Sequence, residues 1–413
     1  MATFDRSARV SCGLEGLDAI LQGGFIEASM QLIAGHTGTG KTTFALQWML
    51  DSRQRGIPVL YVSLSQSRDE LERIASSHAW DISELGVIDL RNFTADESDL
   101  VTMFRPDEAQ LLDTCDRVVA EVERSGARHV VLDTLCEMRL LVDSSLVFRR
   151  QMLRLKHTLK DLGCTVMLLD DAQSVEEDAT VRNLVDVLIL LEHQPQPYGR
   201  DMRRLRLRKM RGSNFLGGYH DYVIETGGIV VHPRVVGDGS HTHVFTDMAA
   251  TGIEGLDELL GGGLLRGTRT LVFGPTGIGK STMACQICGE AARRGERSLI
   301  WTFDESRATM LQRIKTQAQD GYDTDLIAIR HMNPHTMSPG QLARGIWEQV
   351  DAGEDISFLV IDTLNGLEQA IPDHRARMPQ LQDLLSRLAE RGVISILTMA
   401  QWSGVTDTHS QGL

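Results

Sequence analysis

The sequence predicts an α/β protein with two tandem domains, each built on a mainly parallel central sheet. Short apolar runs such as HVVLD, TVMLLD, SLIWTF and FLVID are typical of strands buried on both faces. Helical stretches separate these runs: after Lys41, the residues Leu46, Met49 and Leu50 fall on one helix face, and the stretch ends at Gly56. Strands that alternate with helices in this way indicate a sheet of parallel strands.

A long internal repeat accounts for the two domains. The stretch GLEGLDAILQGGF begins at Gly13 and returns as GIEGLDELLGGGL at Gly252, an offset of 252 − 13 = 239 residues. The same offset holds without insertion or deletion as far as Gln66, and it later becomes 362 − 133 = 229, so the second copy is shorter in between. A period of this length in a chain of 413 residues indicates a duplicated domain rather than a solenoid.

The boundary between the copies is predicted from a change in composition. The segment from Val235 to Ala250, VVGDGSHTHVFTDMAA, is rich in Gly, Ser, Thr and His and interrupts the apolar periodicity. We therefore expect a first domain at residues 1–235, a linker at 236–246 and a second domain at 247–413.

Composition restricts the class of protein. No apolar run is long enough to cross a bilayer, and the first residues, MATFDRSARV, lack a hydrophobic signal segment. Six scattered cysteines do not form a disulfide framework. The formal charge of −14 disfavours nonspecific attraction to nucleic acid or to anionic lipid. These features predict a cytoplasmic protein without a membrane partner and make nucleic acid an unlikely partner.

Each half carries a phosphate-loop motif between an apolar run and a helical stretch. GHTGTGKT, from Gly35 to Thr42, follows MQLIA, and GPTGIGKS, from Gly274 to Ser281, follows RTLVF. Both match the Walker A pattern in the strand–loop–helix context that this pattern requires. Glycines allow the backbone to turn so that successive N–H groups and the helix N-terminus point at phosphate oxygens.

The side chains of these loops predict the ligand. Lys41 and Lys280 would supply positive charge to the terminal phosphates of ATP, and the hydroxyls of Thr42 and Ser281 would bind Mg²⁺. The residues predicted to bind nucleotide in the two loops are Gly35, Thr37, Gly38, Thr39, Gly40, Lys41, Thr42 and Thr43, and then Gly274, Thr276, Gly277, Ile278, Gly279, Lys280, Ser281 and Thr282.

A magnesium site also needs a carboxylate from a neighbouring strand end. HVVLDT contains Asp133 and FLVIDT contains Asp362, in each case at the end of an apolar run. A single Asp at this place is often only a turn residue. Its repetition downstream of both phosphate loops favours the metal role, so we predict Thr42 with Asp133 and Ser281 with Asp362 as the metal ligands.

On these motifs the chain resembles the KaiC family of RecA-like ATPases. The resemblance covers nearly the whole chain. It rests on the GLEGLD and GIEGLD openings, both Walker A loops, the Walker B strands that end in Asp133 and Asp362, and the segment RKMRGSNFLGGYHDYVIETGGIVVHP. It implies two tandem RecA-like P-loop domains. It also implies a double-layered homohexamer in which ATP is held between neighbouring subunits of each layer.

The resemblance further assigns a role to one pair of residues in each half. Family members carry adjacent acidic residues there that activate the attacking water, and the second half has Asp304 and Glu305 in FDESRAT. The first half has Ser65 and Gln66 in LSQSRDE, and an amide cannot take a proton as a carboxylate can. We expect the first site to bind ATP but hydrolyse it poorly. The alternative is that both pairs are merely solvated loop positions.

A second asymmetry runs in the opposite direction. Lys209 and Arg211 in the first half match the family's Lys-x-Arg motif, whose side chains reach the γ-phosphate bound to the adjoining subunit. The alternative is an alternating strand that is basic on its solvated face. The second half has no counterpart, since the sequence reaches Leu413 before the family's last strands, and we expect the second domain to be truncated there.

Three functions follow from the sequence. The preferred one is a slow, hexameric regulatory or signalling ATPase, with a first site for ATP-dependent assembly and a second site that carries the hydrolytic carboxylate; it is compatible with a protein signalling partner. One alternative is a DNA-dependent motor of the RecA or DnaB kind, which the acidic charge disfavours. The other is a noncatalytic scaffold stabilised by ATP. Autokinase activity stays open.

Overall fold

The computed structural model describes residues 8–91, 106–177, 179–196, 200–237, 244–317, 323–333, 336–353, 355–370 and 374–401. Residues 402–413, on which the predicted truncation falls, lie outside this description, as do residues 238–243 of the predicted linker. Contacts divide the chain into two compact units, Met1–Pro195 with Asp201–Pro233, and Gln196–Arg200 with Arg234–Leu413. Each unit is described by itself.

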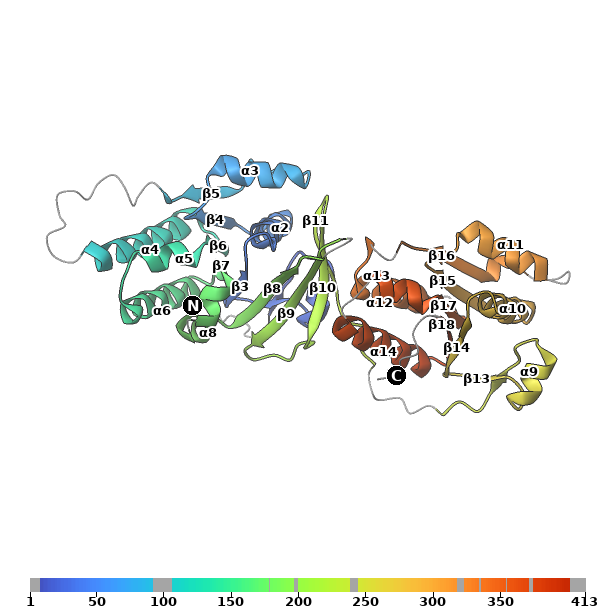
Figure 1. Ribbon diagram of the computed structural model, residues 1–413. Coiled ribbons are helices and arrows are strands. Elements are labelled where there is room, and N and C mark those ends of the chain that lie inside the picture. The colour runs from blue at the N-terminus through green and yellow to red at the C-terminus, as the bar shows by residue number, and fades with distance from the viewer. Residues whose placement is uncertain are drawn as a thin grey trace. The chain divides into compact units, whose positions relative to one another are not determined.

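The first unit is built on a nine-stranded sheet with the order β11-β10-β9-β8-β3-β7-β6-β4-β5 (Figure 1). Strands β8, β3, β7, β6, β4 and β5 pair in parallel, whereas β9, β10 and β11 are added by antiparallel pairing. The strands are β3 (Met30–Gly35), β4 (Val59–Ser63), β5 (Gly86–Asp89), β6 (His129–Asp133), β7 (Thr165–Asp170), β8 (Val187–Gln194), β9 (Met202–Met210), β10 (Tyr219–Glu225) and β11 (Gly228–His232). A separate ribbon pairs β1 (Arg9–Val10) with β2 (Phe25–Ile26).

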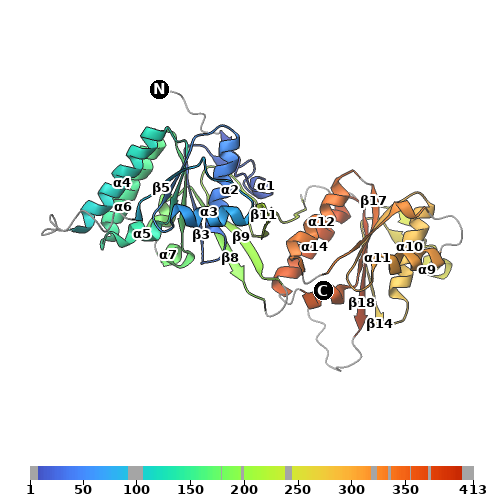
Figure 2. The ribbon, with the colours of Figure 1, turned by 90° about the horizontal axis from the view of Figure 1, so that it is seen from above.

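Helices cover both faces of this sheet (Figures 1 and 2). They are α1 (Leu17–Ile20), α2 (Lys41–Gln54), α3 (Arg68–Ser77), α4 (Pro106–Ser125), α5 (Leu135–Leu140), α6 (Ser145–Asp161), α7 (Ala172–Glu177) and α8 (Ala179–Leu184). One buried cluster joins α2 and α3 to one face, and a second joins α4 and α6 to the other. All six residues of β3 are buried, as its continuous apolar run predicts.

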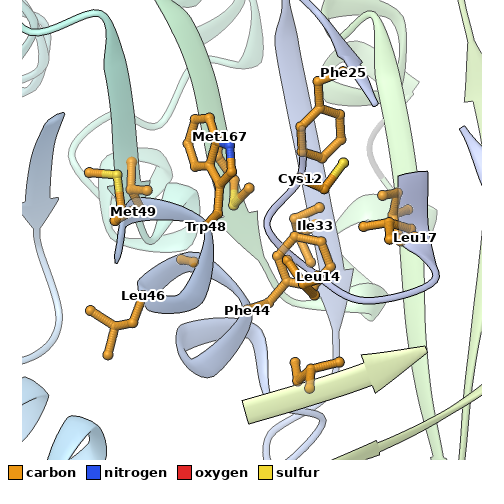
Figure 3. Packing of buried hydrophobic residues seen from close by; sticks show 14 of the residues in the cluster. Cys12, Leu14, Leu17, Phe25, Ile33, Phe44, Leu46, Trp48, Met49 and Met167 are labelled. Atoms are coloured by element: carbon orange, nitrogen blue, oxygen red, sulfur yellow. The ribbon is translucent and has the colours of Figure 1, made fainter. Parts of the chain in front are cut away.

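The face covered by α2 is tightly packed around Trp48. This side chain is fully buried, and its indole stacks on the His129 ring of β6 with 4.8 Å between ring centroids. Figure 3 shows Phe44, Trp48 and Met49 of α2 packed among labelled side chains that include Met167 of β7. Helix α2 is thereby fixed on the sheet, and its first residue, Lys41, is held at the end of β3.

The second unit contains a five-stranded parallel sheet with the order β14-β18-β17-β15-β16. Its strands are β14 (Arg269–Pro275), β15 (Arg297–Thr302), β16 (Ile327–His331), β17 (Ile356–Asp362) and β18 (Ile394–Gln401), and a ribbon pairs β12 (Met248–Ala249) with β13 (Leu264–Leu265). The helices are α9 (Glu254–Leu259), α10 (Lys280–Arg293), α11 (Arg307–Gln317), the 3₁₀ helix η2 (Thr324–Leu326), α12 (Pro339–Asp351), α13 (Leu364–Ala370) and α14 (His374–Glu390).

The two sheets share one topology. Strands β3-β7-β6-β4-β5 of the first unit correspond in order to β14-β18-β17-β15-β16 of the second. Both units are therefore α/β folds of the RecA-like kind that the sequence predicts. In sheets of this type, ligands bind beyond the carboxyl ends of the strands, and the phosphate loops that follow β3 and β14 lie at those ends. Within the described residues, no helix has the length and apolarity to cross a membrane.

Candidate nucleotide-binding sites

The first phosphate loop connects the end of β3 to the start of α2. Gly40 precedes the helix with φ of 91°, a left-handed conformation that glycine adopts readily. A Cβ at Gly40 would lie 2.6 Å from Cδ1 of Ile224, and one at Gly35 would lie 2.5 Å from Oγ1 of Thr39. The loop therefore needs glycine at both positions for steric reasons, as a backbone that wraps closely around phosphate requires.

The second loop repeats this arrangement between β14 and α10. Gly279 precedes α10 with φ of 102°, and no side chain caps the N-terminus of either α2 or α10. The first N–H groups of a helix have no partner within the helix, and the helix dipole places partial positive charge there. Both helix ends consequently offer backbone donors to an anion such as a phosphate.

The two loop lysines take equivalent positions. The Lys41 ammonium donates to the carbonyls of Gly35 at 2.5 Å and His36 at 3.1 Å. The Lys280 ammonium donates to the carbonyls of Gly274 at 2.9 Å and Pro275 at 2.8 Å. Each ammonium group thus lies over the start of its own loop. From there it would contact the terminal phosphates of a bound nucleotide.

Three carboxylates lie near the first loop lysine. Burial lowers the pKa of Lys41, whereas the carboxylates of Asp171, Asp133 and Asp170 act to raise it. Asp170 pairs with Arg139 at 3.0 Å on its other side. In the second sheet, the 229-residue offset places Met399 and Ala400 where the first has Asp170 and Asp171, so two of these carboxylates are absent there.

The second metal pair that the sequence predicts is in direct contact. Ser281 Oγ donates to Asp362 Oδ1 at 3.0 Å, and Thr398 Oγ1 donates to the same oxygen. Burial raises the pKa of Asp362, the hydrogen bonds from Thr398 and Ser281 lower it, and nearby Glu305 raises it further.

The first metal pair has a different supporting hydroxyl. Tyr61 Oη donates to Asp133 Oδ2 at 2.6 Å. Burial raises the pKa of Asp133, and the Tyr61 hydrogen bond, the Lys41 charge and a Thr42 hydrogen bond all lower it. Each site therefore offers one hydroxyl and one carboxylate. These hard oxygen donors suit Mg²⁺, which commonly takes one or two protein ligands and completes its shell with phosphate and water.

No larger metal centre competes with this interpretation in the part of the chain that the structure describes. Groups of three or more His, Cys, Asp or Glu side chains that could hold a metal are absent among those residues. The donor set thus fits a magnesium ion bound together with a nucleotide, rather than an ion held by protein alone.

The two sequence-predicted water-activating positions lie in identical turns. Ser63 Oγ bonds the N–H of Gln66 at 3.1 Å and its carbonyl at 2.6 Å, and Thr302 Oγ1 bonds the N–H and carbonyl of Glu305 at 3.2 Å and 3.0 Å. Strands β4 and β15, which lead into these turns, each pair with the strand that ends in the aspartate predicted to bind the metal. The turns are therefore adjacent to the predicted magnesium positions.

In the second unit this adjacency is visible in a side-chain contact. Thr363, which follows Asp362, donates from Oγ1 to Asp304 Oδ2 at 2.8 Å. Glu305 Oε1 accepts from Arg313 at 2.7 Å, while Glu305 Oε2 is buried without a hydrogen-bond partner. In the first unit Ser65 is exposed and Gln66 is half-buried, and Oε1 of Gln66 likewise lacks a partner.

Lys209 and Arg211 lie far from the phosphate loop of their own unit. Lys209 on β9 is level with Leu188 of β8 and so with Leu32 of β3, three residues before Gly35. The N–H of Arg211 bonds the carbonyl of the residue before β8, at the start of the sheet. At about 3.3 Å per strand residue, Lys209 lies roughly 10 Å from the loop along the strand direction, and Arg211 lies farther.

Their side chains extend away from that loop as well. The Lys209 ammonium donates to the carbonyls of Arg182 at 2.8 Å and Val185 at 2.6 Å, at the amino end of β8. Lys156 binds Asp186 there at 2.9 Å, and Arg211 lies 3.7 Å from the same carboxylate. Three cations thus surround one anion. Burial lowers the pKa of Lys209, as do the neighbouring charges of Arg211 and Lys156.

Sequence reasoning missed the side chains that hold the predicted residues. Tyr61 and Thr398, which bind the two aspartates, occupy different strands, and their counterparts at the repeat offsets are Ile300 and Leu169. The repeat therefore gave no signal for them. The repeat did contain a signal for Arg313. At the 239-residue offset, this cation corresponds to Ile74, so the two halves differ in charge there just as they do at Glu305 and Gln66.

The chain is similar in sequence to known proteins. The chain is 28% identical over 315 residues to the circadian clock oscillator protein KaiC of Acaryochloris marina, an alignment that covers 72% of this chain and 58% of that protein. The circadian clock oscillator protein KaiC of Picosynechococcus is 28% identical over 312 residues, with the same two shares. That of Synechococcus elongatus is 26% identical over 329 residues, covering 76% of this chain and 61% of that protein.

These alignments span about three fifths of the relatives' length. The KaiC ATPase family model matches residues 10–236 and 249–413, so it includes both phosphate loops and both strands that end in aspartate. Because this match covers both repeats and nearly the whole chain, the protein belongs to the KaiC family of ATPases.

Proposed function

We propose that the protein binds Mg-ATP at both sites, retains it at the first site to hold an assembly together, and hydrolyses it at the second. Membership of a P-loop ATPase family supports ATP as the ligand. One observation carries the division of labour: Gln66 and Glu305 occupy the same hydrogen-bonded turn, next to the same kind of metal-binding strand end, and differ in whether the side chain can accept a proton.

Mg²⁺ would be held by Thr42 and Asp133 in the first site and by Ser281 and Asp362 in the second. When bound, the ion neutralises charge on the phosphates. The loop N–H groups and Lys41 or Lys280 would orient those phosphates, which is most of what an enzyme contributes to phosphoryl transfer.

Hydrolysis in the second site would depend on Glu305. Its Oε2 lacks a hydrogen-bond partner in the protein, so it is the carboxylate oxygen left to accept a proton from an attacking water. A positioned general base contributes about 10²–10⁴ in rate. Asp304, bound to Thr363, is an acidic neighbour at the same edge of the sheet. Gln66 can hold a water by hydrogen bonds but cannot take its proton.

Assembly would depend on Lys209 and Arg211. They lie toward the opposite end of the sheet from their own phosphate loop, so we assign them to a phosphate bound on another copy of the chain. The surplus of positive charge around Asp186 suits that role. A homohexamer in which each first site is shared by two subunits satisfies this arrangement, since a ring closes all such head-to-tail contacts.

The proposal is tested by purification with and without Mg-ATP, followed by mass determination and analysis of the bound nucleotide. We expect a hexamer with Mg-ATP that dissociates when a chelator removes the ion, because a ligand bound across an interface stabilises the assembled state. A monomer at saturating Mg-ATP would overturn the assembly role. Undetectable ATP turnover in an intact hexamer would favour the scaffold alternative instead.

A further inference from the structure

Glu305 is held by a cation whose place in the repeat is informative. Arg313 of α11 donates from Nη2 to Glu305 Oε1 at 2.7 Å, and the two side chains are only 26% and 28% exposed. The pair is therefore largely shielded from water, where a charge-assisted hydrogen bond orients a carboxylate more firmly than at an open surface. Glu305 Oε2 is left without a partner.

The first unit has different residues at both positions of this pair. The offsets 305 − 239 = 66 and 313 − 239 = 74 place Gln66 and Ile74 at the equivalent positions. Ile74 lies on α3, is half-buried and packs against the first unit's apolar core. The half without the carboxylate therefore also has no arginine at the position of Arg313.

Helix packing does not account for the cation. Leu71 of α3 and Met310 of α11 are equivalent and both buried, at 0% and 1% exposure. Ser67 and Ser306 are also equivalent, and each accepts a hydrogen bond from a backbone N–H in the first turn of its helix. Both helices thus have a serine that caps the first turn and a buried apolar residue at the equivalent position, although one has an arginine and the other an isoleucine. The difference between Arg313 and Ile74 instead matches the difference between Glu305 and Gln66.

We propose that Arg313 is the positioning residue of the second site: by binding Oε1 of Glu305, it fixes the carboxylate so that Oε2 is the oxygen that accepts the proton. This inference rests on the proposed role of Glu305 as the general base. The first site would then hydrolyse ATP poorly for two reasons: it has no carboxylate at Gln66, and it has no cation at Ile74 to orient a carboxylate placed there.

The first experiment removes the cation from the intact protein. Arg313→Met retains most of the side-chain length, and Arg313→Lys retains the charge. We expect Arg313→Met to lower the kcat for ATP hydrolysis about 10- to 100-fold, a usual cost of losing a group that orients a reacting one. KM, affinity for a nonhydrolysable ATP analogue and the melting temperature should change little, and Arg313→Lys should restore part of the kcat.

A double-mutant cycle separates this inference from the proposed function. If Arg313 acts through Glu305, then Arg313→Met should cause no further loss of kcat in a Glu305→Gln protein. Wild-type turnover in Glu305→Gln itself would overturn the proposed function. Loss of turnover in Glu305→Gln with unchanged kcat in Arg313→Met would overturn only the positioning role. If Arg313→Met and Arg313→Lys both lowered the analogue affinity and the melting temperature to the same extent, the role of Arg313 would be purely structural. That result would also overturn the positioning role.

The second experiment builds the pair in the first unit. Lys280→Ala is used as the background so that turnover at the first site is read alone. We expect Gln66→Glu with Ile74→Arg to hydrolyse ATP faster than Gln66→Glu alone, while Ile74→Arg alone leaves turnover unchanged. Equal rates for the single Gln66→Glu and the double variant, with both proteins folded by circular dichroism, would contradict the inference.

Discussion

The two units of this chain have kept the same sheet and phosphate loop but differ in the residues beside the loop. Both use the strand order β3-β7-β6-β4-β5 or its equivalent, a left-handed glycine before the helix and a lysine over the loop carbonyls. The first has Gln66 and Ile74 where the second has Glu305 and Arg313. The residues predicted to bind nucleotide are thus alike in both units, whereas the residues proposed to activate and orient the attacking water differ.

A second difference lies at the sheet edge beside the phosphate-loop strand. In the first unit β3 is bordered by β8, and β9 to β11 extend the sheet to carry Lys209. In the described residues of the second unit, β14 is the edge strand of the sheet. Its Leu271 and Phe273 side chains are 41% and 56% exposed. The described structure thus places the basic cluster of Lys156, Lys209 and Arg211 in the unit that has Gln66 where the other has Glu305.

The largest expected effect is the loss of ATP hydrolysis when the Glu305 carboxylate is removed. Glu305→Gln should reduce steady-state ATP hydrolysis by about 10²–10⁴, the usual contribution of a general base. Gln66→Ala should change it less than about twofold, since an amide contributes no proton transfer. Phosphate release from the purified hexamer measures both. A larger loss in Gln66→Ala than in Glu305→Gln would reverse the assignment of the sites.

The next effect concerns the two loop lysines. Lys41→Ala should impair hexamer formation strongly, because ATP at the first site is proposed to bridge subunits, and Lys280→Ala should impair it less. The mass distribution is compared at a fixed ATP concentration by native mass spectrometry. Loss of turnover in Lys41→Ala with the hexamer intact, combined with normal turnover in Lys280→Ala, would contradict the account.

The basic cluster should contribute a smaller effect on assembly. Lys209→Ala and Arg211→Ala should each raise the ATP concentration needed for half-maximal hexamer formation about 10-fold or more, as loss of one partner in a buried charged contact commonly does. Arg208→Ala is the matched control, because Arg208 is on the same strand and is exposed. An equal shift for all three variants would indicate a general charge effect rather than a specific contact.

The smallest predicted effect is local and concerns stability. Ser67 and Glu70 form a reciprocal capping box at the start of α3, whereas Ser306 at the start of α11 is bonded to Thr309 and has no such carboxylate. Ser67→Ala should lower the free energy of unfolding of the first unit by about 1 kcal/mol. Denaturant unfolding measures it, and a larger cost for Ser306→Ala in its own unit would contradict the comparison.

Most of the site was predictable from local patterns. The phosphate loops, Asp133 and Asp362 each follow an apolar strand at a short, fixed distance along the chain, and secondary structure then fixes their position. Tyr61 and Thr398 were not predictable in the same way, because their contacts depend on which strands are neighbours across the sheet. The contacts of Lys209 likewise depend on the register between β8 and β9. The position of Lys209 in the sequence relative to the other motifs does not determine that register.

The most direct test of the central claim follows the fate of nucleotide in each half of one protein. The hexamer is loaded with labelled ATP and Mg²⁺, freed of unbound nucleotide, and quenched at intervals to measure bound ATP and ADP per subunit. The account predicts that one nucleotide per subunit becomes ADP while the other stays ATP, that Glu305→Gln keeps both as ATP, and that the hexamer persists throughout. Conversion of both nucleotides at one rate, or a Lys280→Ala protein that hydrolyses its remaining ATP as fast as wild type, would contradict it.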